Sequence, residues 1–185
     1  FGRRQETSVV QHDPWLSIDG ALNIIGEQLR LAGIRLIVNA QPSVYTVQCN
    51  QDQLEQVLLN LLSNARDAIL NKAAAESADW PRNIEISLGR APDGGLRLSV
   101  TDTGGGIPQD ALAKIFEPFF TTKPAGKGTG LGLSLSRSIV RENGGELTVT
   151  NVDKGARFEV DLPLFAGDQT GIDHAVPSRA PEAAD

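Results

Sequence analysis

The sequence predicts an α+β fold, a two-layer α/β sandwich in which helices cover one face of a mixed sheet. Three observations support this prediction. Segments with helical periodicity alternate with pairs of short strands, whereas a doubly wound sheet would alternate single strands with helices. Glycine and proline clusters separate the periodic segments. The 185 residues, 40% of them hydrophobic, suffice for one domain with its own core.

The first predicted helix covers residues 17–32. Ser17 is its expected N-cap, and Gly33 is expected to end it. Apolar residues recur at helical spacing along this stretch, and they are Ile18, Leu22, Ile25 and Leu29.

Two strands and the longest helix come next. The strands cover residues 34–38 and 45–49, with a turn at 39–43 between them. The helix covers residues 52–72, and a loop is expected at 73–82. The apolar face of this helix consists of Leu54, Leu58, Leu61, Ala65 and Ile69.

The second half of the chain begins with a β-hairpin. Its strands cover 84–88 and 96–100, and the turn between them is Pro-Asp-Gly-Gly at 92–95. The remaining predicted elements are a short helix at 109–115, the aromatic segment FEPFF, a glycine-rich stretch at 126–132, a helix at 131–143 and strands at 146–151 and 156–162.

Composition divides the chain into three parts. Residues 1–13 are polar and are expected to form a linker, and residues 14–165 are expected to form the folded domain. Residues 166–185 are rich in Ala, Pro, Asp and Gly, so we expect a disordered tail. Because the chain starts at Phe1 and contains no Met, we expect it to be a piece of a longer protein.

Charge and cysteine content argue against several classes of function. Seventeen Lys and Arg against 23 Asp and Glu give a net charge of −6, which disfavours nucleic acid as a partner. The single cysteine, Cys49, excludes a disulfide framework and a cysteine-based metal site. No apolar run approaches the roughly 20 residues needed to span a bilayer, so this chain is not expected to cross a membrane.

The longest predicted helix carries a polar stripe. Asn60, Asn64 and Asp67 are spaced i, i+4 and i+7, which places them on one helix face at about 100° per residue. A solvated face is one interpretation, although such faces more often carry Glu, Lys or Arg. Carboxamide oxygens one turn apart are also suited to Mg²⁺, a cation that takes oxygen ligands. The spacing alone leaves both interpretations open.

The first glycine-rich segment, VTDTGGGIP, follows a predicted strand that ends at Asp102. A buried carboxylate at such a point can accept a hydrogen bond from an exocyclic amine. Gly104 and Gly106 would let a ligand approach the backbone closely. The alternative is a tight turn capped by Asp102.

The second glycine-rich segment, GKGTGLGLS, has glycine at every second position just before a helix. Such a loop can aim several N–H groups at a phosphate, and a merely flexible loop is the alternative. It is not a P-loop, because Gly128 follows Lys127 where Ser or Thr is required. The dinucleotide pattern G-x-G-x-x-G also fails in both segments. A nucleotide site of another kind is therefore predicted.

Four motifs together resemble the catalytic ATP-binding domain of histidine kinases, which shares a superfamily with gyrase-type, Hsp90-type and MutL-type ATPases (GHKL). They are the N box LLNLLSNARDAI, a first glycine box DTGGGI, the F box FEPFF and a second glycine box GTGLGLS. The resemblance covers about residues 17–164 and implies the Bergerat-type ATP-binding fold, with ATP and Mg²⁺ as cofactors. TTK at 121–123, and Asp67 where many relatives have Lys, are most similar to the nitrogen-regulation and dicarboxylate-sensor branch.

The resemblance implies a role for each matching position. Asn64 would ligate Mg²⁺, and Asn60, the implied catalytic residue, would hold the metal's water or orient the γ-phosphate. Asp102 would receive the adenine amino group. The other implied nucleotide-binding residues are Asp67, Gly104, Gly106, Ile107, Lys123, Lys127, Gly128, Thr129, Gly130, Leu131 and Gly132. Residues 107–127 would form a lid over ATP, with Phe116, Phe119 and Phe120 as anchors.

The resemblance also implies transfer of the ATP γ-phosphate to a histidine. Hydrolysing relatives carry Glu at the position of Asn60, and an amide cannot act as a general base, so transfer to a side chain is favoured over transfer to water. Neither His12 nor His174 lies in the family's acceptor motif. The acceptor is therefore expected on a separate helical dimerisation domain that precedes the linker. Arg157 stands where the family often has a small hydroxyl residue.

The expected partners are that phosphoacceptor domain and a response regulator, within a homodimeric parent whose catalytic domain lies in the cytoplasm. An inner-membrane anchor elsewhere in the parent is compatible with this expectation. Two other functions remain as alternatives: a GHKL-type ATPase clamp that dimerises on ATP, and a non-catalytic nucleotide-binding or docking module.

Overall fold

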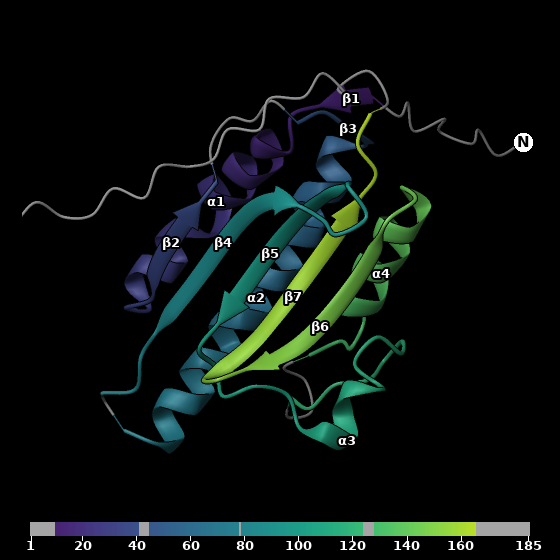
Figure 1. Ribbon diagram of the computed structural model, residues 1–185. Helices are drawn as coiled ribbons and strands as arrows, with labels where there is room; N and C mark the ends of the chain where they lie inside the picture. Colours follow the sequence, from purple (N-terminus) through teal and green to yellow (C-terminus); the bar gives the residue numbers. More distant parts are fainter. Residues whose placement is uncertain (1–9, 41–44, 78, 124–127, 166–185) are drawn as a thin grey trace, which may run out of the picture.

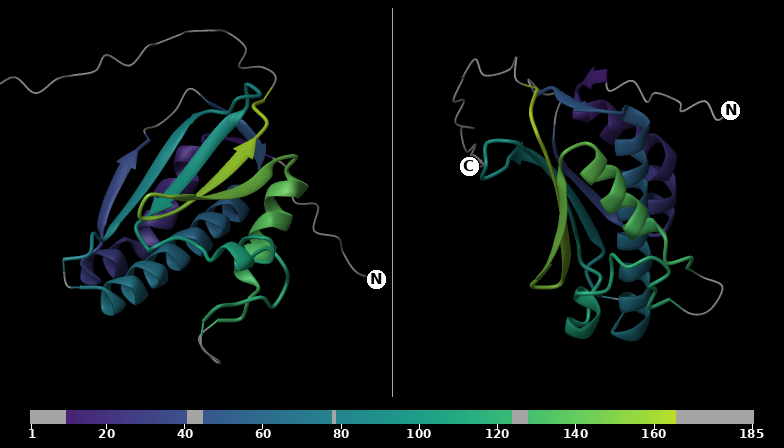
Figure 2. Two further views of the ribbon diagram at one scale, coloured as in Figure 1. Left: turned by 60° about the horizontal axis from the view of Figure 1, so that its bottom comes forward. Right: turned by 90° about the vertical axis from the view of Figure 1, so that its right-hand side faces the viewer.

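The computed structural model describes residues 10–40, 45–77, 79–123 and 128–165. A five-stranded sheet in the order β2-β4-β5-β7-β6 forms one layer, and helices cover one of its faces (Figures 1 and 2). Only the β2–β4 pair is parallel, so the sheet is mixed and the predicted two-layer α+β fold is confirmed. The elements are β1 (Val10–His12), α1 (Pro14–Leu31), β2 (Arg35–Asn39), β3 (Val47–Cys49), α2 (Gln51–Ala75), β4 (Asn83–Arg90), β5 (Leu96–Asp102), α3 (Gln109–Leu112), α4 (Gly132–Glu142), β6 (Glu146–Val152) and β7 (Gly155–Leu162).

Helix α1 begins three residues earlier than predicted. Asp13 is the N-cap, and its Oδ1 accepts a hydrogen bond from the Trp15 amide at 2.9 Å. Pro14 follows at the first helical position, where its missing N–H costs nothing. Ser17, the expected cap, is fully buried within the helix and donates to the Gln51 carbonyl at 3.1 Å.

The prediction that residues 1–13 form a linker is wrong for the residues from Val10 onward. Strand β1 pairs antiparallel with β3, so the chain from Val10 onward belongs to the folded domain. Residues 1–9 and the expected tail at 166–185 lie outside the described part of the chain. The other end of the domain returns to the same small sheet, because Leu164 forms a bridge with Val47.

The two strands flanking residues 39–43 do not pair with each other. Strand β2 lies parallel to β4, and β3 pairs with β1. Their partners are distant in sequence, so a local pattern of alternating side chains identifies the strands but not their neighbours.

Helix α2 is the central element of the helical layer. It begins after the N-cap Asn50 and extends into the predicted loop at 73–82, where three alanines favour continued helix. It packs against α1 and α4 and lies across β4 and β5. Its buried face consists of Leu54, Val57, Leu58, Leu61, Leu62, Ala65, Ile69 and Ala73. The polar stripe is not part of this core-facing side of the helix.

The predicted hairpin forms, and the two strands predicted after the last helix also pair with each other. Strands β4 and β5 pair antiparallel, as do β6 and β7. Helix α3 is shorter than expected, covering Gln109–Leu112, and α4 covers Gly132–Glu142. None of the helices among the described residues is both long and apolar enough to cross a bilayer.

Candidate nucleotide-binding site

A cavity of about 760 Å³ lies beside the polar stripe of α2. Its walls come from α2, from the segment after β5, from the segments on either side of 124–127, and from β7. Residues that the sequence singled out and that line it are Asn60, Asn64, Asp67, Asp102, Gly106, Ile107, Lys123, Gly128, Thr129, Gly130 and Gly132. The structure therefore brings together three motifs that are far apart in the chain.

The α2 wall continues the polar stripe by one more turn. Asn71 lines the cavity together with Asn60, Asn64 and Asp67. It was missed by the sequence analysis, although its i+7 spacing from Asn64 was a usable signal. Asn60 donates from Nδ2 to the Gly132 carbonyl at 3.2 Å and to Ser136 Oγ at 3.1 Å. Asn60 therefore ties the start of α4 to α2.

Asp102 ends β5 at the far side of the cavity and is only 5% exposed. Its Oδ1 accepts hydrogen bonds from the Gly104 amide at 2.7 Å and the Ala156 amide at 3.4 Å. Burial raises the pKa of Asp102, and these two backbone donors partly offset the rise. Both bonds go to Oδ1, so Oδ2 is left as an acceptor for a ligand.

The first glycine segment is held by packing and by one side chain of β6. A Cβ at Gly104 would lie against Ala68 of α2, and Gly104 does not line the cavity. Gly104 therefore packs closely on the helix, and its implied role beside the base stays a prediction. Asn151, which the sequence analysis missed, accepts from the Ile107 amide and donates to the Ile107 carbonyl, both at 2.8 Å.

The second glycine segment enters α4 directly. Gly130 adopts a φ of 67°, and its carbonyl accepts from the Phe119 amide at 2.9 Å. Leu131 does not line the cavity and is 41% exposed, and its implied contact with phosphate stays a prediction. Lys127 lies outside the described residues.

The three phenylalanines of the F box do not act alike. Phe116 and Phe120 pack against the hydrophobic core, and the Arg137 guanidinium lies 4.9 Å from the centroid of the Phe116 ring. Phe119 has a φ of 67° and is 74% exposed, so its expected role as a packed anchor is wrong. It contributes its backbone bond to Gly130 instead.

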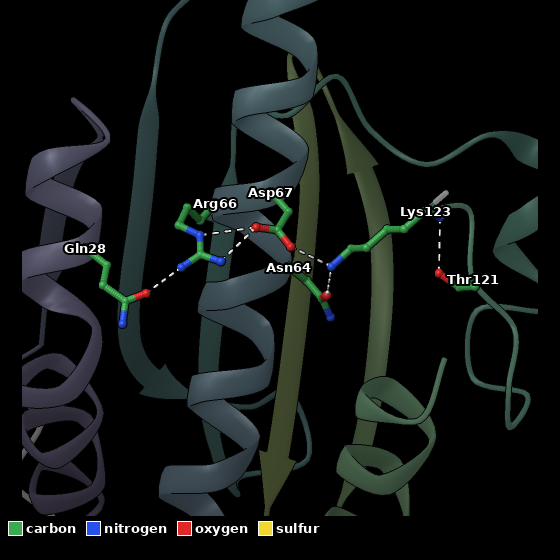
Figure 3. Close-up of polar contacts among 6 residues, drawn as sticks. All are labelled: Gln28, Asn64, Arg66, Asp67, Thr121 and Lys123. Atoms are coloured by element: carbon green, nitrogen blue, oxygen red, sulfur yellow. Dashed lines mark hydrogen bonds and ion pairs between the residues drawn. The ribbon is translucent and has the colours of Figure 1, made fainter. Parts of the chain in front are cut away.

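Lys123 reaches across the cavity to α2 (Figure 3). Its Nζ donates to Asp67 Oδ2 at 2.7 Å and to Asn64 Oδ1 at 3.2 Å. Arg66 binds Asp67 Oδ1 from the other side, at 2.9 Å. Burial alone would raise the pKa of Asp67, but hydrogen bonds and charges from Lys123 and Arg66 together hold it below its ordinary value.

Two positions noted in the sequence lie away from this chemistry. The Arg157 side chain is exposed and donates to Thr101 Oγ1 at 3.1 Å, while its neighbours Ala156 and Phe158 line the cavity. His12 is buried and lies 3.2 Å from Ser17 Oγ, which suits a packed core residue. His174 lies outside the described residues.

The cavity fits a metal-bound nucleotide. A cation, the Lys123 ammonium, already lies against Asn64 Oδ1, so that oxygen is placed to accept a positive charge. Within the described residues, no group of three or more His, Cys, Asp or Glu side chains could hold a metal ion. A metal at Asn64 would therefore depend on oxygens that phosphates and water bring. Asp102 at the other side offers a buried acceptor for an exocyclic amine.

Comparison with known proteins gives a consistent result. Residues 49–166 match the family described as histidine kinase-, DNA gyrase B- and HSP90-like ATPase. The chain is 45% identical over 171 residues to the two-component sensor PprA of Pseudomonas aeruginosa, covering 92% of this chain and 18% of that protein. It is 35% identical over 153 residues to the sensor histidine kinase ZraS of Salmonella typhimurium, covering 82% and 30%. The chain thus spans less than a third of either relative.

Solved structures with the same fold are also similar in sequence. The mycobacterial sensor histidine kinase MprB gives a TM-score of 0.68 at 27% identity, covering 84% of this chain and 98% of that one. The catalytic domain of the histidine kinase ThkA gives 0.67 at 29% identity, covering 83% and 96%.

Proposed function

The chain belongs to the histidine kinase-, DNA gyrase B- and HSP90-like ATPase family, and from this membership we propose that the whole protein transfers the γ-phosphate of ATP to one of its own histidines. The chain is the ATP-binding catalytic domain of a two-component sensor histidine kinase. The acceptor histidine lies on a separate helical domain. The observation that carries the proposal is a single cavity with the buried carboxylate of Asp102 at one side and Asn64 at the other.

Each end of the nucleotide has a candidate partner. Asp102 accepts a hydrogen bond from the adenine amino group, and the apolar side chains of Ile107 and Phe158 line the same cavity. Asn64 holds Mg²⁺, which when bound neutralises phosphate charge. Gly128, Gly130 and the N-terminus of α4 offer backbone N–H groups to the phosphates. The ShkA histidine kinase, whose structure resembles this chain at a TM-score of 0.66 and 25% identity, was solved in complex with AMPPNP.

The chemistry of the Asn60 side chain favours transfer of the γ-phosphate over hydrolysis of ATP. Its amide cannot accept a proton at neutral pH, so it cannot activate water as a general base. Its Nδ2 also donates to the Gly132 carbonyl, which holds the phosphate-binding turn in place. We therefore assign Asn60 to positioning the phosphate end of the site and the reaction to transfer onto a side chain.

The parent protein supplies the remaining parts. The proposed partners are a helical phosphoacceptor domain, which forms the homodimer, and a response regulator that receives the phosphoryl group. Relatives named as a two-component sensor and a sensor histidine kinase support this arrangement. The need for ATP places the domain in the cytoplasm of the parent's cell.

Phosphoryl transfer in trans tests the proposal. The chain is mixed with the parent's helical domain and radiolabelled Mg-ATP, and acid-labile, base-stable labelling of that domain is measured. We expect labelling with the wild type and none with Asn64→Ala. Asn23→Ala, on the exposed side of α1, is the matched control and should label normally. Equal labelling with Asn64→Ala contradicts the proposal, and rapid steady-state phosphate release without labelling would favour the ATPase clamp.

A further inference from the structure

Lys123 occupies the place at which the metal is expected. Its Nζ lies 3.2 Å from Asn64 Oδ1, the oxygen that the proposed function assigns to Mg²⁺. A divalent cation and an ammonium at contact distance from the same oxygen would repel each other strongly. Lys123 must therefore leave Asn64 when a metal-bound nucleotide binds.

We propose that Lys123 is an internal cation that holds the described lid segment 119–123 against α2 in the nucleotide-free domain, and that Asp67 is the positioning residue that keeps Lys123 there. Lys123 and the metal then exchange at Asn64. This inference rests on the proposed function, since it takes Asn64 to be the metal ligand.

Asp67 is built to hold a cation on the cavity side. Arg66 binds its Oδ1, which leaves Oδ2 to Lys123, and Gln28 of α1 accepts from Arg66 at 2.6 Å (Figure 3). The carboxylate is thereby oriented from two directions. Its position in the polar stripe places a negative charge beside the proposed phosphate site. Lys123 of the lid adds a second positive charge beside Asp67, opposite Arg66 of α2.

The contact is weak enough to be exchanged. The side chains of Lys123 and Asp67 are 27% and 28% exposed, so water partly screens the pair. Lys carries its charge on a flexible stem with three donors, which lets it turn from Asp67 to a phosphate without moving the backbone far. Of the ion pairs among the described residues, this is the one that joins the lid to α2.

Apart from Phe120, whose side chain packs on the core and whose amide binds the Glu117 carbonyl, the lid segment near Lys123 has few other attachments. The Phe119 amide binds the Gly130 carbonyl, and the Lys123 amide binds Thr121 Oγ1 at 3.1 Å. Loss of the Lys123–Asp67 contact should therefore be visible as faster amide hydrogen exchange in residues 119–123.

Hydrogen exchange on the nucleotide-free 185-residue chain tests the contact. Asp67→Asn and Lys123→Ala should each speed exchange of the segment 119–123 by about tenfold, and the double variant should be no faster than either single variant. Glu76→Gln removes an acid just after the end of α2 that pairs with Lys72 outside the cavity, and this variant should show the hydrogen exchange of the wild type. Wild-type exchange in Asp67→Asn or Lys123→Ala, or additive effects in the double variant, would overturn the proposal.

Calorimetry with Mg-ADP tests the exchange of cations. Asp67→Asn frees Lys123 and removes a negative charge near the phosphates, so it should bind Mg-ADP about fivefold more tightly than wild type. Glu76→Gln should match the wild type. An Asp67→Asn affinity no higher than that of Glu76→Gln would overturn the proposal. If the wild type showed no magnesium-dependent binding at all, the proposed function would be contradicted instead. The hydrogen-exchange experiment would still test the Lys123–Asp67 contact in that case.

Discussion

The two sides of the cavity are held together by different kinds of contact. Near Asp102, backbone groups carry the bonds. The Gly104 and Ala156 amides donate to its carboxylate, and Asn151 binds both backbone groups of Ile107. Most of these atoms sit at the ends of sheet strands, where the core fixes their positions.

Near Lys123, side chains bind side chains. Lys123 reaches Asn64 and Asp67, and Arg66 holds Asp67 in turn. Such groups are partly exposed and have rotatable stems, so their bonds can be exchanged at a small cost in free energy. This difference supports the proposal that the side for the base is preorganised and that the side for the phosphates rearranges when a nucleotide binds.

The largest expected effect is on nucleotide affinity. It comes from a substitution that changes the hydrogen-bonding groups of the base side but keeps its shape. Asp102→Asn keeps an oxygen for the Gly104 amide but presents an NH₂ group where the adenine amine would donate. We expect about a 10- to 100-fold loss of Mg-ATP affinity by calorimetry, the size of a lost hydrogen bond to a charged group. Asp93→Asn, in the exposed β4–β5 turn, is the control and should bind normally. Unchanged affinity in Asp102→Asn would mean that the base lies elsewhere.

A steric change on the base side should lower stability. A Cβ at Gly104 would press on Ala68 and the α2 backbone, so Gly104→Ala should reduce the free energy of unfolding by about 1–3 kcal/mol. Gly26→Ala, which meets no atom within 4 Å in the middle of α1, should raise it by about 0.5–1 kcal/mol. Urea denaturation measures both, and effects of the same sign would contradict the packing described here.

The two carboxylates should respond to pH in opposite directions. Because the pKa of Asp102 is raised on folding, its native state binds more protons, and its contribution to stability falls as pH rises from about 4. The pKa of Asp67 is lowered, so its contribution is present above about pH 4 and is lost as pH falls through its folded value.

Urea denaturation between about pH 3 and 6 checks this contrast. Relative to wild type, Asp102→Asn should gain stability as pH rises, and Asp67→Asn should lose it. Parallel pH profiles for the two variants would show that the two sides do not differ electrostatically.

The smallest effect is expected at the exposed aromatic residue of the lid. Phe119→Asn should change the free energy of unfolding by less than about 0.5 kcal/mol, because the side chain is exposed and Asn tolerates a positive φ. Phe120→Ala, at a side chain packed on the core, should cost more, about 1–3 kcal/mol. A large loss of stability in Phe119→Asn would show that the Phe119 side chain does anchor the lid.

The sequence predicted the parts of the site that depend on local spacing. The stripe on α2 follows from helical periodicity, and the alternating glycines Gly128 and Gly130 come just before α4. Contacts between distant segments escaped prediction. The pairing of Asn151 with Ile107 and the closure of Lys123 onto Asp67 depend on how strands and lid come together in space.

The same reasoning explains where the fold predicted from the sequence was wrong. Strand β2 was identified, but its parallel partner β4 lies beyond the whole of α2. Ser17 was a plausible cap by residue type, yet Asp13 followed by Pro14 is the stronger signal for a helix start. Phe119 was grouped with its neighbours by type, and only its backbone conformation shows why it points outward.

A structure of the chain with Mg²⁺ and a non-hydrolysable ATP analogue tests the central claim most directly. We predict the adenine amino group on Asp102 Oδ2, the metal on Asn64 Oδ1, and Lys123 moved away from Asn64. Adenine bound away from Asp102, or a metal held by residues outside α2, would contradict this account.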